Sequence, residues 1–511
     1  MQAPGVRRWL ALGALAVAML TIGLDVTVLT VALPTLAVDL HAGTSDLQWF
    51  SSAYTLALAA VMLPAGALGD RYGRKKFLLG ALLLFGVASA ICAFAGSSGE
   101  LIAARVVLGI AAAVMIPLSM AVLPALFPEP AERQRAITIW ITSTAIGMPL
   151  GPILGGWLLQ HYWWGSVFLI NVPLVIVGAL AVGALVPESR SEHAFRIDLP
   201  GVALSILGML GITYGFIRIG QKNWGDVTAW ATIAIGLVAA VAFVLWQRRN
   251  TQPLVDLKLF ASSGFRWGTI YSIIVNFAMF GLLFTMPQYF QAVLGTDALG
   301  SGLRLLPMIG GLAAGTRLVD KLLAKAGIRT VLTTGFALLA AGLVLGALIG
   351  AHTSYGLAAA ALVLLGFGMG FVMPSAMGLA MGDLAAERAG SGSALLQALR
   401  QASGTIGVAI LGTVLATQYR SSLGAANHEP LSDGVNAGVA VARKLGDPAL
   451  LGHVQSAFTD GMSLMLWVCA AIAAAAAVLA ATMTRGGHAS DTPDRPADTP
   501  VPDAGQSVHV G

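Results

Sequence analysis

Long apolar runs with few charges constrain the fold of this chain more than any other feature of its sequence. Fourteen such runs follow one another, and short polar segments separate them. A helix of about 20 apolar residues crosses the hydrocarbon core of a membrane. Lipid offers no hydrogen-bond partners to the backbone, so we expect each run to form a helix. The predicted spans cover residues 9–36, 47–69, 77–96, 101–126, 135–159, 166–186, 200–219, 227–246, 267–286, 300–319, 330–350, 355–380, 391–417 and 457–482.

The composition favours a membrane protein over a soluble one. Hydrophobic residues make up 57% of the chain and charged residues only 10%, against about 25% charged residues in a typical soluble domain. The net charge of +5 does not indicate nucleic-acid binding, because the basic residues lie in short loops between apolar runs. The two cysteines, Cys92 and Cys469, lie inside apolar runs, so neither a disulfide framework nor a metal site is expected.

The distribution of Lys and Arg predicts the orientation of the helices, because basic residues in short loops stay on the cytoplasmic side. With the N-terminus inside, the inner segments hold 21 of the 29 basic residues and the outer segments hold four. The other four lie within helices or at helix ends, and they are Arg105, Arg218, Arg304 and Arg400. We therefore predict both termini in the cytoplasm, a long outer loop over 418–456 and a disordered tail over 485–511.

Asp25 is the most unusual residue of the predicted spans. Of the 24 acidic residues, it alone lies well inside an apolar run, where an uncompensated charge is costly. Removal from water favours the neutral form of a carboxyl group, so Asp25 can exchange a proton or neutralise a bound cation. The structural alternative is a fixed ion-pair or hydrogen-bond partner that holds helices together.

Arg105 is the only basic residue clearly inside the first six spans, and we expect it to line a cavity or to take part in function. At 1.5 Å per residue, Arg105 lies roughly 6 Å and Asp25 roughly 16 Å from the outer ends of their helices. A direct pair is therefore not expected, unless the long arginine side chain or a water molecule narrows the gap.

The loop between the second and third predicted spans has an ordered pattern of glycines and charges. Glycines allow close helix contact and the charged side chains can meet helix ends, so the loop can act as a latch between two conformations. The alternative is a plain topology anchor. The pattern resembles the GxLxDRxGRK loop of the major facilitator superfamily, and its residues are Gly66, Gly69, Asp70, Arg71, Gly73, Arg74 and Lys75.

The fifth predicted span is rich in glycine, and three of its glycines share one helix face. Dense glycine by itself indicates close helix packing. The segment resembles the antiporter motif GxxxGPxxGG, and the resemblance implies a pliable helix whose contacts tip the protein between conformations. Its motif residues are Gly147, Gly151, Pro152, Gly155 and Gly156.

Further segments resemble the fourteen-helix drug:proton antiporters of this superfamily, which include exporters of quaternary ammonium compounds. The matching segments are 24–34, 105–109, 163–173, 253–257, 288–291 and 302–307, and the resemblance covers 9–482. It implies an all-α integral membrane fold with six-helix halves over 9–186 and 267–482. Linkers and two additional transmembrane helices over 187–266 join the halves.

Aromatic rings near Asp25 can shape a cation pocket, since ring faces attract cations by roughly 0.5 to 2 kcal/mol. Each ring can instead pack in the core or face lipid. Some relatives carry additional acids in the helices that start near 300 and 391, and this chain has none in those two spans. A high-affinity site for doubly charged cations is therefore not expected. The candidate aromatic residues are Trp49, Tyr54, Trp140, Tyr271 and Tyr289.

The resemblance implies a transporter and not an enzyme. The expected function is export of lipophilic, mainly cationic drugs or antiseptics through the inner (cell) membrane of a bacterium, coupled to proton uptake. Asp25 would bind the proton or the cation in turn, while Arg105 would tune the pKa of Asp25. The sequence has no glycine-lysine nucleotide loop, so we expect the proton gradient as energy source, no cofactor and no metal.

The expected partners are small lipophilic or cationic molecules, protons and membrane lipid, with the chain acting as a monomer. One alternative is export of a self-made antibiotic or a lipid-like metabolite by the same scaffold. An alternative of another class is a channel or an intramembrane enzyme. An enzyme would need a second polar catalytic group near Asp25 or Arg105, and the sequence places no histidine, cysteine pair or carboxylate dyad there.

Overall fold

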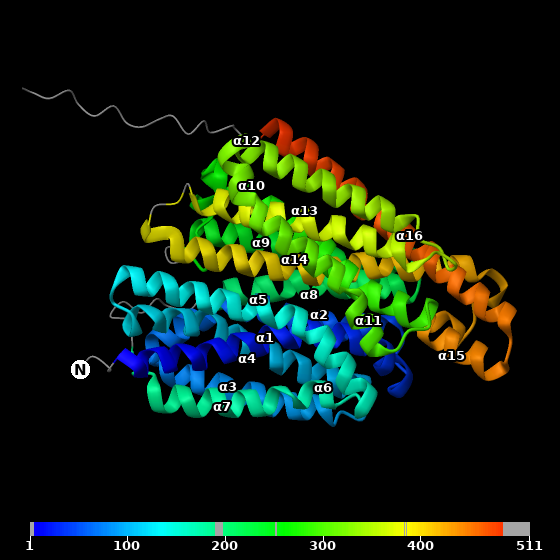
Figure 1. Cartoon of the computed structure of the whole chain (residues 1–511), viewed down its shortest axis with the longest axis horizontal. Coiled ribbons are helices and arrows are strands. Elements are labelled where there is room, and N and C mark those ends of the chain that lie inside the picture. Colours follow the sequence, from blue (N-terminus) through cyan, green and yellow to red (C-terminus); the bar gives the residue numbers. More distant parts are fainter. Residues whose placement is uncertain (1–4, 190–197, 251–252, 383, 385, 484–511) are drawn as a thin grey trace, which may run out of the picture.

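The computed structural model of this chain describes residues 5–189, 198–250, 253–382, 384 and 386–483, except for the side chains of some helical residues. Within these ranges the chain forms helices and no strand (Figure 1). The first helices are α1 (Gly5–Asp39), α2 (Thr44–Tyr72), α3 (Arg74–Ala93), α4 (Ser98–Leu126), α5 (Pro130–His161), α6 (Ser166–Leu169), α7 (Asn171–Leu185), α8 (Leu199–Gln221) and α9 (Val227–Arg249). After η1 (Leu257–Ala261) come α10 (Ser263–Gln288), η2 (Tyr289–Val293), α11 (Ala298–Arg304), α12 (Leu306–Ala347), α13 (Tyr355–Gly382), α14 (Ala386–Leu423), η3 (Gly424–Ala426), η4 (Leu431–Asp433), α15 (Val435–Leu445) and α16 (Pro448–Met483).

The helices confirm the predicted all-α membrane fold. Twelve helical segments in the described ranges are long and apolar enough to cross a membrane. The other two predicted spans lie in α2 and α5, which are helices of 29 and 32 residues. Most helices continue a few residues beyond the predicted spans, because a helix keeps its backbone hydrogen bonds where it leaves the lipid.

The helices pack as two groups around separate hydrophobic cores. One core is built mainly from residues of α1–α7, and the other from residues of α10–α16. Figure 1 shows the two groups as layers, with α1–α7 below α10–α16. The start of α1 and the end of α16 lie at the same end of the bundle, which we call the terminal end, and α15 marks the opposite end, the α15 end.

Glycines turn the chain at matching places in the two groups. Gly73 lies between α2 and α3 with φ of 119°, and Gly327 breaks α12 with φ of 75°. Residues with a side chain rarely adopt backbone φ values in this left-handed region, so glycine is required at both turns. Each turn joins the second and third spans of its group, which fits two repeated halves.

The segment 418–456 was predicted as a loop, and the structure differs. Helix α14 continues to Leu423, and α15 occupies Val435–Leu445 before α16 begins at Pro448. The apolar residues Val435, Val439 and Ala442 on one face of α15 are buried, while Arg443 and Lys444 are exposed. An amphipathic face of this kind packs against the bundle and leaves the charges in water.

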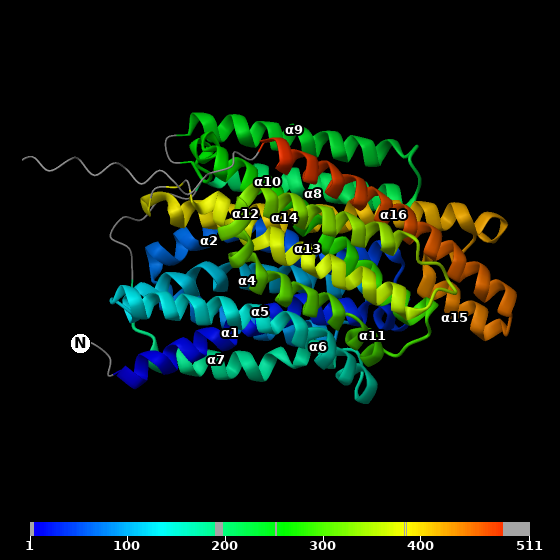
Figure 2. The same ribbon diagram turned by 45° about the horizontal axis from the view of Figure 1, so that its top comes forward.

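The hairpin of α8 and α9 packs with α8 against α14 and α2, and Figure 2 shows it along the upper edge of the bundle. The ring of Tyr214 on α8 lies 6.3 Å from that of Trp49 on α2. On the other side of the seam between the two groups, Thr413 of α14 donates a hydrogen bond to the Phe216 carbonyl at 2.6 Å, and Gly220 of α8 lies against Thr413. Helix α8 therefore contacts both groups.

Asp198 fixes the terminal end of this hairpin. Its carboxylate accepts hydrogen bonds from the Gly201 amide at 3.0 Å, from Trp246 Nε1 at 2.8 Å and from Gln247 Nε2 at 2.8 Å. Partial burial alone would raise the pKa of Asp198, but these hydrogen bonds outweigh burial and hold the pKa below its ordinary value of 3.8. The carboxylate thus caps α8 and joins it to α9.

Replacing Asp198 by alanine is expected to lower the stability of the protein by about 1–2 kcal/mol and by more than the loss of a cap alone, because the cap of α8 and the hydrogen bonds from Trp246 and Gln247 of α9 are lost together. A depressed pKa gives stability that is present above the ordinary pKa and is lost as the pH falls through the depressed value. The apparent melting temperature in detergent, measured from pH 7 to pH 3 for both proteins, tests this. Asp447→Ala is the control. Asp447 also caps a helix, α16, but in the described part of the chain its carboxylate accepts hydrogen bonds only from backbone amides. An equal loss in the two variants would contradict the prediction.

The two groups contact each other mainly toward the α15 end. Gln291 Nε2 donates to the Val31 carbonyl at 2.9 Å, and Thr44 Oγ1 donates to the Asp433 carbonyl at 2.9 Å. A contact nearer the terminal end joins Thr405 and Thr55 through their hydroxyl groups at 2.7 Å. The bundle is therefore closed at the α15 end.

Candidate functional site

Asp25 and Arg105 form an ion pair inside the first group of helices. Asp25 comes from the middle of α1 and Arg105 from α4, and Arg105 Nη1 lies 2.8 Å from Asp25 Oδ2. Their side chains are 0% and 2% exposed. Charges buried this deeply persist only when they are paired and hydrogen-bonded.

Neighbours on α2 hold the guanidinium of Arg105 from a second side. Arg105 Nε donates to the Phe50 carbonyl at 3.1 Å. The guanidinium carbon also lies 4.5 Å from the ring centre of Tyr54, within the range of a cation–π interaction. Gly109, one turn further along α4, allows this approach, because a Cβ there would lie 2.3 Å from the Tyr54 carbonyl oxygen.

Asn171 completes the surroundings of Asp25. It is the first residue of α7, and its Nδ2 donates to Asp25 Oδ1 at 2.9 Å and to Ser89 Oγ at 3.3 Å. Both carboxylate oxygens of Asp25 thus have a donor. Asn171 lies in a segment that resembles the family, but its residue type alone predicted no role at the site. The one sequence feature that marks Asn171 is a side-chain amide at the start of an apolar helix.

The direct pair differs from the expected separation of Asp25 and Arg105 along the membrane axis. The prediction was wrong because it placed the outer ends of the two helices at one level. Helix α1 continues to Asp39, three residues beyond its predicted end, and α4 starts at Ser98, three before its predicted start. Fourteen residues separate Asp25 from the end of α1, and seven separate Arg105 from the start of α4. The two side chains touch across this difference, so residue counts from level helix ends do not predict the contact.

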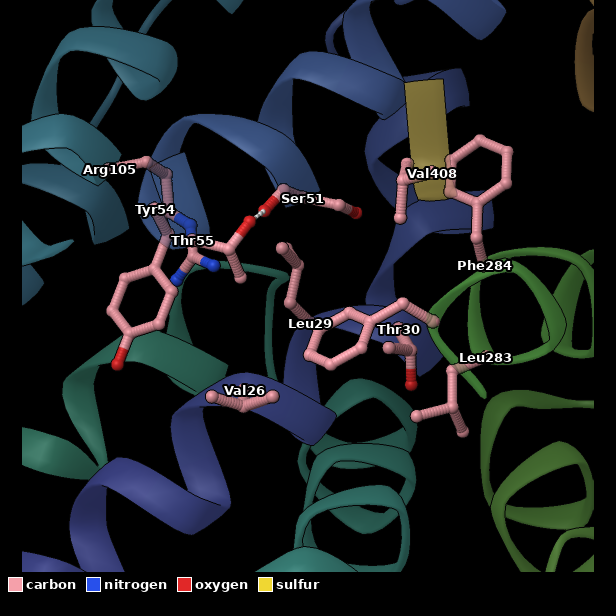
Figure 3. Close-up of a pocket in the computed structure, with 11 residues that line it drawn as sticks. Val26, Leu29, Thr30, Ser51, Tyr54, Thr55, Arg105, Leu283, Phe284 and Val408 are labelled. Carbon is pink, nitrogen blue, oxygen red and sulfur yellow. Dashed lines mark hydrogen bonds between the residues drawn. The ribbon is translucent and has the colours of Figure 1, made fainter. Parts of the chain in front are cut away.

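A small cavity lies beside the ion pair, where the two groups of helices meet (Figure 3). The cavity has a volume of about 20 Å³, which is enough for one water molecule. Arg105 and Tyr54 lie on one side, and Phe284, Leu283 and Val408 lie across from them. The remaining lining residues are Val26, Leu29, Thr30, Ser51, Thr55 and Phe280.

Unpaired hydroxyl groups adjoin this cavity. Tyr54 and Ser51 line the cavity, and Tyr54 Oη and Ser51 Oγ are buried and have no hydrogen-bond partner among the described residues. Buried polar groups normally have a partner. The α2 wall can therefore bind water or a polar group of a ligand.

Only one of the five aromatic candidates lies against the ion pair. Tyr54 is that residue. Trp49 lies against Tyr214 of α8, and Trp140 donates its Nε1 to Ser119 Oγ at 2.9 Å. The other two candidates belong to the second core, where Tyr271 and Tyr289 are fully buried. Sequence position alone could not distinguish these places, because each ring lies within or at the end of an apolar run.

The loop between α2 and α3 is held within the first group of helices. Arg74 Nη1 donates to the Ala121 carbonyl of α4 at 3.0 Å, and the Lys75 amide donates to Glu188 Oε1 at 3.1 Å. At Gly69 a Cβ would lie 2.1 Å from Leu118 Cδ2, and the Arg71 guanidinium lies 5.4 Å from the Tyr72 ring. Gly73 supplies the turn described above. Two further residues of the pattern lie outside the described side chains, Gly66 and Asp70.

The glycines of α5 allow two different close contacts. Gly147, Gly151 and Gly155 face α1, where a Cβ would lie 2.5 Å from the Leu20 carbonyl oxygen, 2.1 Å from Thr27 Oγ1 and 2.6 Å from Val28 Cγ2 respectively. Gly156 instead faces α11 of the other group, where a Cβ would lie 2.5 Å from Leu299 Cα. The Pro152 carbonyl oxygen lies 2.3 Å from a Cβ built at Gly302.

Known proteins resemble the chain over nearly its whole length. The sequence model of the Major Facilitator Superfamily matches residues 15–408. The tetracenomycin C resistance and export protein of Streptomyces glaucescens is 32% identical, over 97% of this chain and 95% of that protein. The multidrug efflux pump LfrA of Mycolicibacterium smegmatis is 32% identical, over 93% of this chain and 95% of that protein.

A solved structure resembles the fold. It is the inward-facing, unoccupied form of a bacterial homologue of the human lysosomal transporter Spinster, with a TM-score of 0.67 and 17% identity over 94% of this chain and 98% of that chain. The match to the family model, the helix arrangement and the length shared with these relatives lead to the same conclusion. This chain belongs to the major facilitator superfamily of membrane transporters.

Proposed function

We propose that this chain is a proton-coupled antiporter that exports lipophilic, mainly cationic compounds from the cytoplasm by alternating access. In this proposal the terminal end of the bundle faces the cytoplasm of a bacterium, and both termini lie there. The protein works as a monomer, the proton gradient supplies the energy, and no other cofactor takes part.

The buried pair of Asp25 and Arg105 is the observation that carries the proposal. Arg105 lines the cavity between the two groups of helices and also contacts Asp25. Protonation of Asp25 cancels its charge, and the attraction that holds Arg105 in place then falls. A proton taken up inside the first group can thereby change the charge and shape of the cavity wall. This links proton binding to ligand binding without a nucleotide.

The relatives support an exporter of foreign compounds and also a second candidate function. One is named as a multidrug efflux pump, and another is named as a tetracenomycin C resistance and export protein. The second name favours export of a self-made antibiotic as the alternative. Growth protection against a panel of dyes and antibiotics distinguishes the two, because a dedicated exporter protects against one chemical class.

Efflux of ethidium from bacterial cells that express the chain tests the proposed function. We expect cells loaded with the dye to lose it faster than cells with an empty vector, and we expect an uncoupler to remove the difference. Depletion of ATP with the proton gradient maintained should leave efflux unchanged. Efflux that persists after the gradient collapses would refute proton coupling.

A further inference from the structure

Two arginines of the spans, Arg304 and Arg400, have no anionic partner in the described part of the chain, and of these two only Arg304 lies over an aromatic ring. The sequence places four arginines within helices or at helix ends. Arg105 pairs with Asp25, and Arg218 pairs with a carboxylate at the α15 end of the hairpin. Arg304 lies over the Tyr355 ring at 5.3 Å. Arg400 of α14 contacts only a neutral side chain, since its Nη1 donates to Gln397 Oε1 at 3.3 Å.

The helix positions of two acids, Glu387 and Asp70, are far from that of Arg400 along the bundle axis. Glu387 precedes it by 13 residues on α14, which corresponds to about 20 Å along the axis. Asp70 lies 15 residues beyond Thr55 on α2, toward the terminal end, while Arg400 lies only five residues from Thr405 in that direction. The Thr55–Thr405 hydrogen bond places these two residues at one level of the bundle. Asp70 and Arg400 are then ten residues apart along the axis, which corresponds to about 15 Å.

Arg400 lies on the strip of α14 that continues from the cavity. Residues at i, i+4 and i+8 share a helix face, which places Arg400 in line with Gly404 and Val408. Val408 lines the cavity, and a Cβ at Gly404 would lie 2.9 Å from the Phe280 ring, another lining residue. Asn276 of α10 also donates a hydrogen bond to the Arg400 carbonyl. Arg400 therefore lies between the cavity and the terminal end.

This position lies beyond a contact between the two groups, toward the terminal end. Thr405 makes a hydrogen bond between the two groups with Thr55, and Arg400 follows about one turn and a half further toward the terminal end. The Arg400 side chain is only partly buried. Along α14, Arg400 thus stands between the terminal end and Val408, which lines the cavity.

We propose that Arg400 binds the acidic group, a carboxylate or a phenolate, of lipophilic substrates, whose apolar part packs against Phe280 and Phe284. This inference rests on the proposed export function and extends its substrate class from cations to acids and zwitterions. The pair of Asp25 and Arg105 is neutral in sum, so Arg400 leaves one uncompensated positive charge beside the route to the cavity. A guanidinium presents a planar fork of donors that matches a carboxylate.

Equilibrium binding to the purified full chain tests this assignment. Fluorescein, which is a dianion near neutral pH, and ethidium, which is a cation, serve as probes in nanodiscs of phosphatidylcholine. We expect Arg400→Gln to raise the Kd for fluorescein about tenfold or more and to leave the Kd for ethidium within about twofold. Arg400→Lys should retain most of the fluorescein affinity, because it keeps the charge.

The matched control is Arg304→Gln, which removes an arginine that lies over Tyr355. It should change neither Kd. An equal loss of affinity for both probes in Arg400→Gln would indicate a packing role and overturn the proposal. A lack of fluorescein binding by the unmodified chain would also overturn it. Unchanged fluorescein binding with a loss of thermal stabilisation by phosphatidylglycerol would assign the arginine to a lipid headgroup and also overturn it. The export function fails separately, in the ethidium efflux assay, where fluorescein plays no part.

Discussion

Replacing Asp25 by asparagine should abolish substrate-driven proton release in proteoliposomes. Asparagine keeps the shape of the side chain but cannot exchange a proton, so binding of the compound no longer displaces one. The variant also leaves Arg105 buried without its 2.8 Å counter-ion. Removal of one partner from a buried pair costs about 3–5 kcal/mol, and we expect a lower apparent melting temperature as well. A pH-sensitive dye outside the vesicles reports the proton release.

A double variant separates the loss of coupling from the loss of stability. Asp25→Asn with Arg105→Gln removes both charges, so the unpaired guanidinium no longer destabilises the first group of helices. We expect the double variant to melt closer to the unmodified protein and still to release no protons. If Asp25→Asn alone transports with its pH dependence intact, Asp25 is a structural residue and the proposed coupling is wrong.

Replacing Gly156 by valine should hold the α15 end open. A Cβ at this position would lie 2.5 Å from Leu299 Cα and 2.7 Å from the Ala298 carbonyl oxygen, both on the other group of helices. Backbone atoms cannot move aside as a flexible side chain can. Overpacking of this kind costs about 1–3 kcal/mol, which shifts a two-state equilibrium by about 5- to 150-fold. Transport should fall accordingly, because the closed state becomes rare.

Spin labels at Tyr162 and Leu303 can measure the opening. Both positions are exposed and lie near the contact of α5 with α11, and the native cysteines Cys92 and Cys469 are buried. We expect a longer distance between the labels in Gly156→Val. Gly80→Val is the control, because no atom lies within 4 Å of a Cβ at Gly80. Identical distance distributions in the two variants would show that Gly156 does not control closure.

The sequence was sufficient to locate the helices, because hydropathy reports directly on what lipid excludes. It also identified Asp25 and Arg105, since each is a charge in an apolar run. Their direct pairing was missed, because residue counts along separate helices do not reveal how those helices tilt or how far their ends project. Only packing of α1 against α4 sets that register.

The surroundings of the pair were harder to predict for a different reason. Asn171 and Tyr54 are uncharged, and such residues inside a span are too common to be singled out by residue type. Their role depends on which face of α7 and α2 meets α1 and α4. Sequence periodicity gives little help in a membrane, because a lipid-facing surface and a buried surface are both apolar. The same limit applies to Arg400, whose isolation from acids appears only in three dimensions.

The hairpin of α8 and α9 has a consequence for how compounds reach the transporter. A lipophilic solute partitions into the bilayer and arrives from the lipid as well as from water. Helix α8 spans the seam between α2 and α14, so lateral access from the bilayer is left to the opposite side of the seam, nearer the terminal end than the close contact of α5 with α11. The rate at which a lipophilic solute reaches the transporter then depends on the concentration of that solute in one leaflet of the bilayer. At equal charge, we expect compounds to rank by their membrane partition coefficient rather than by their concentration in water.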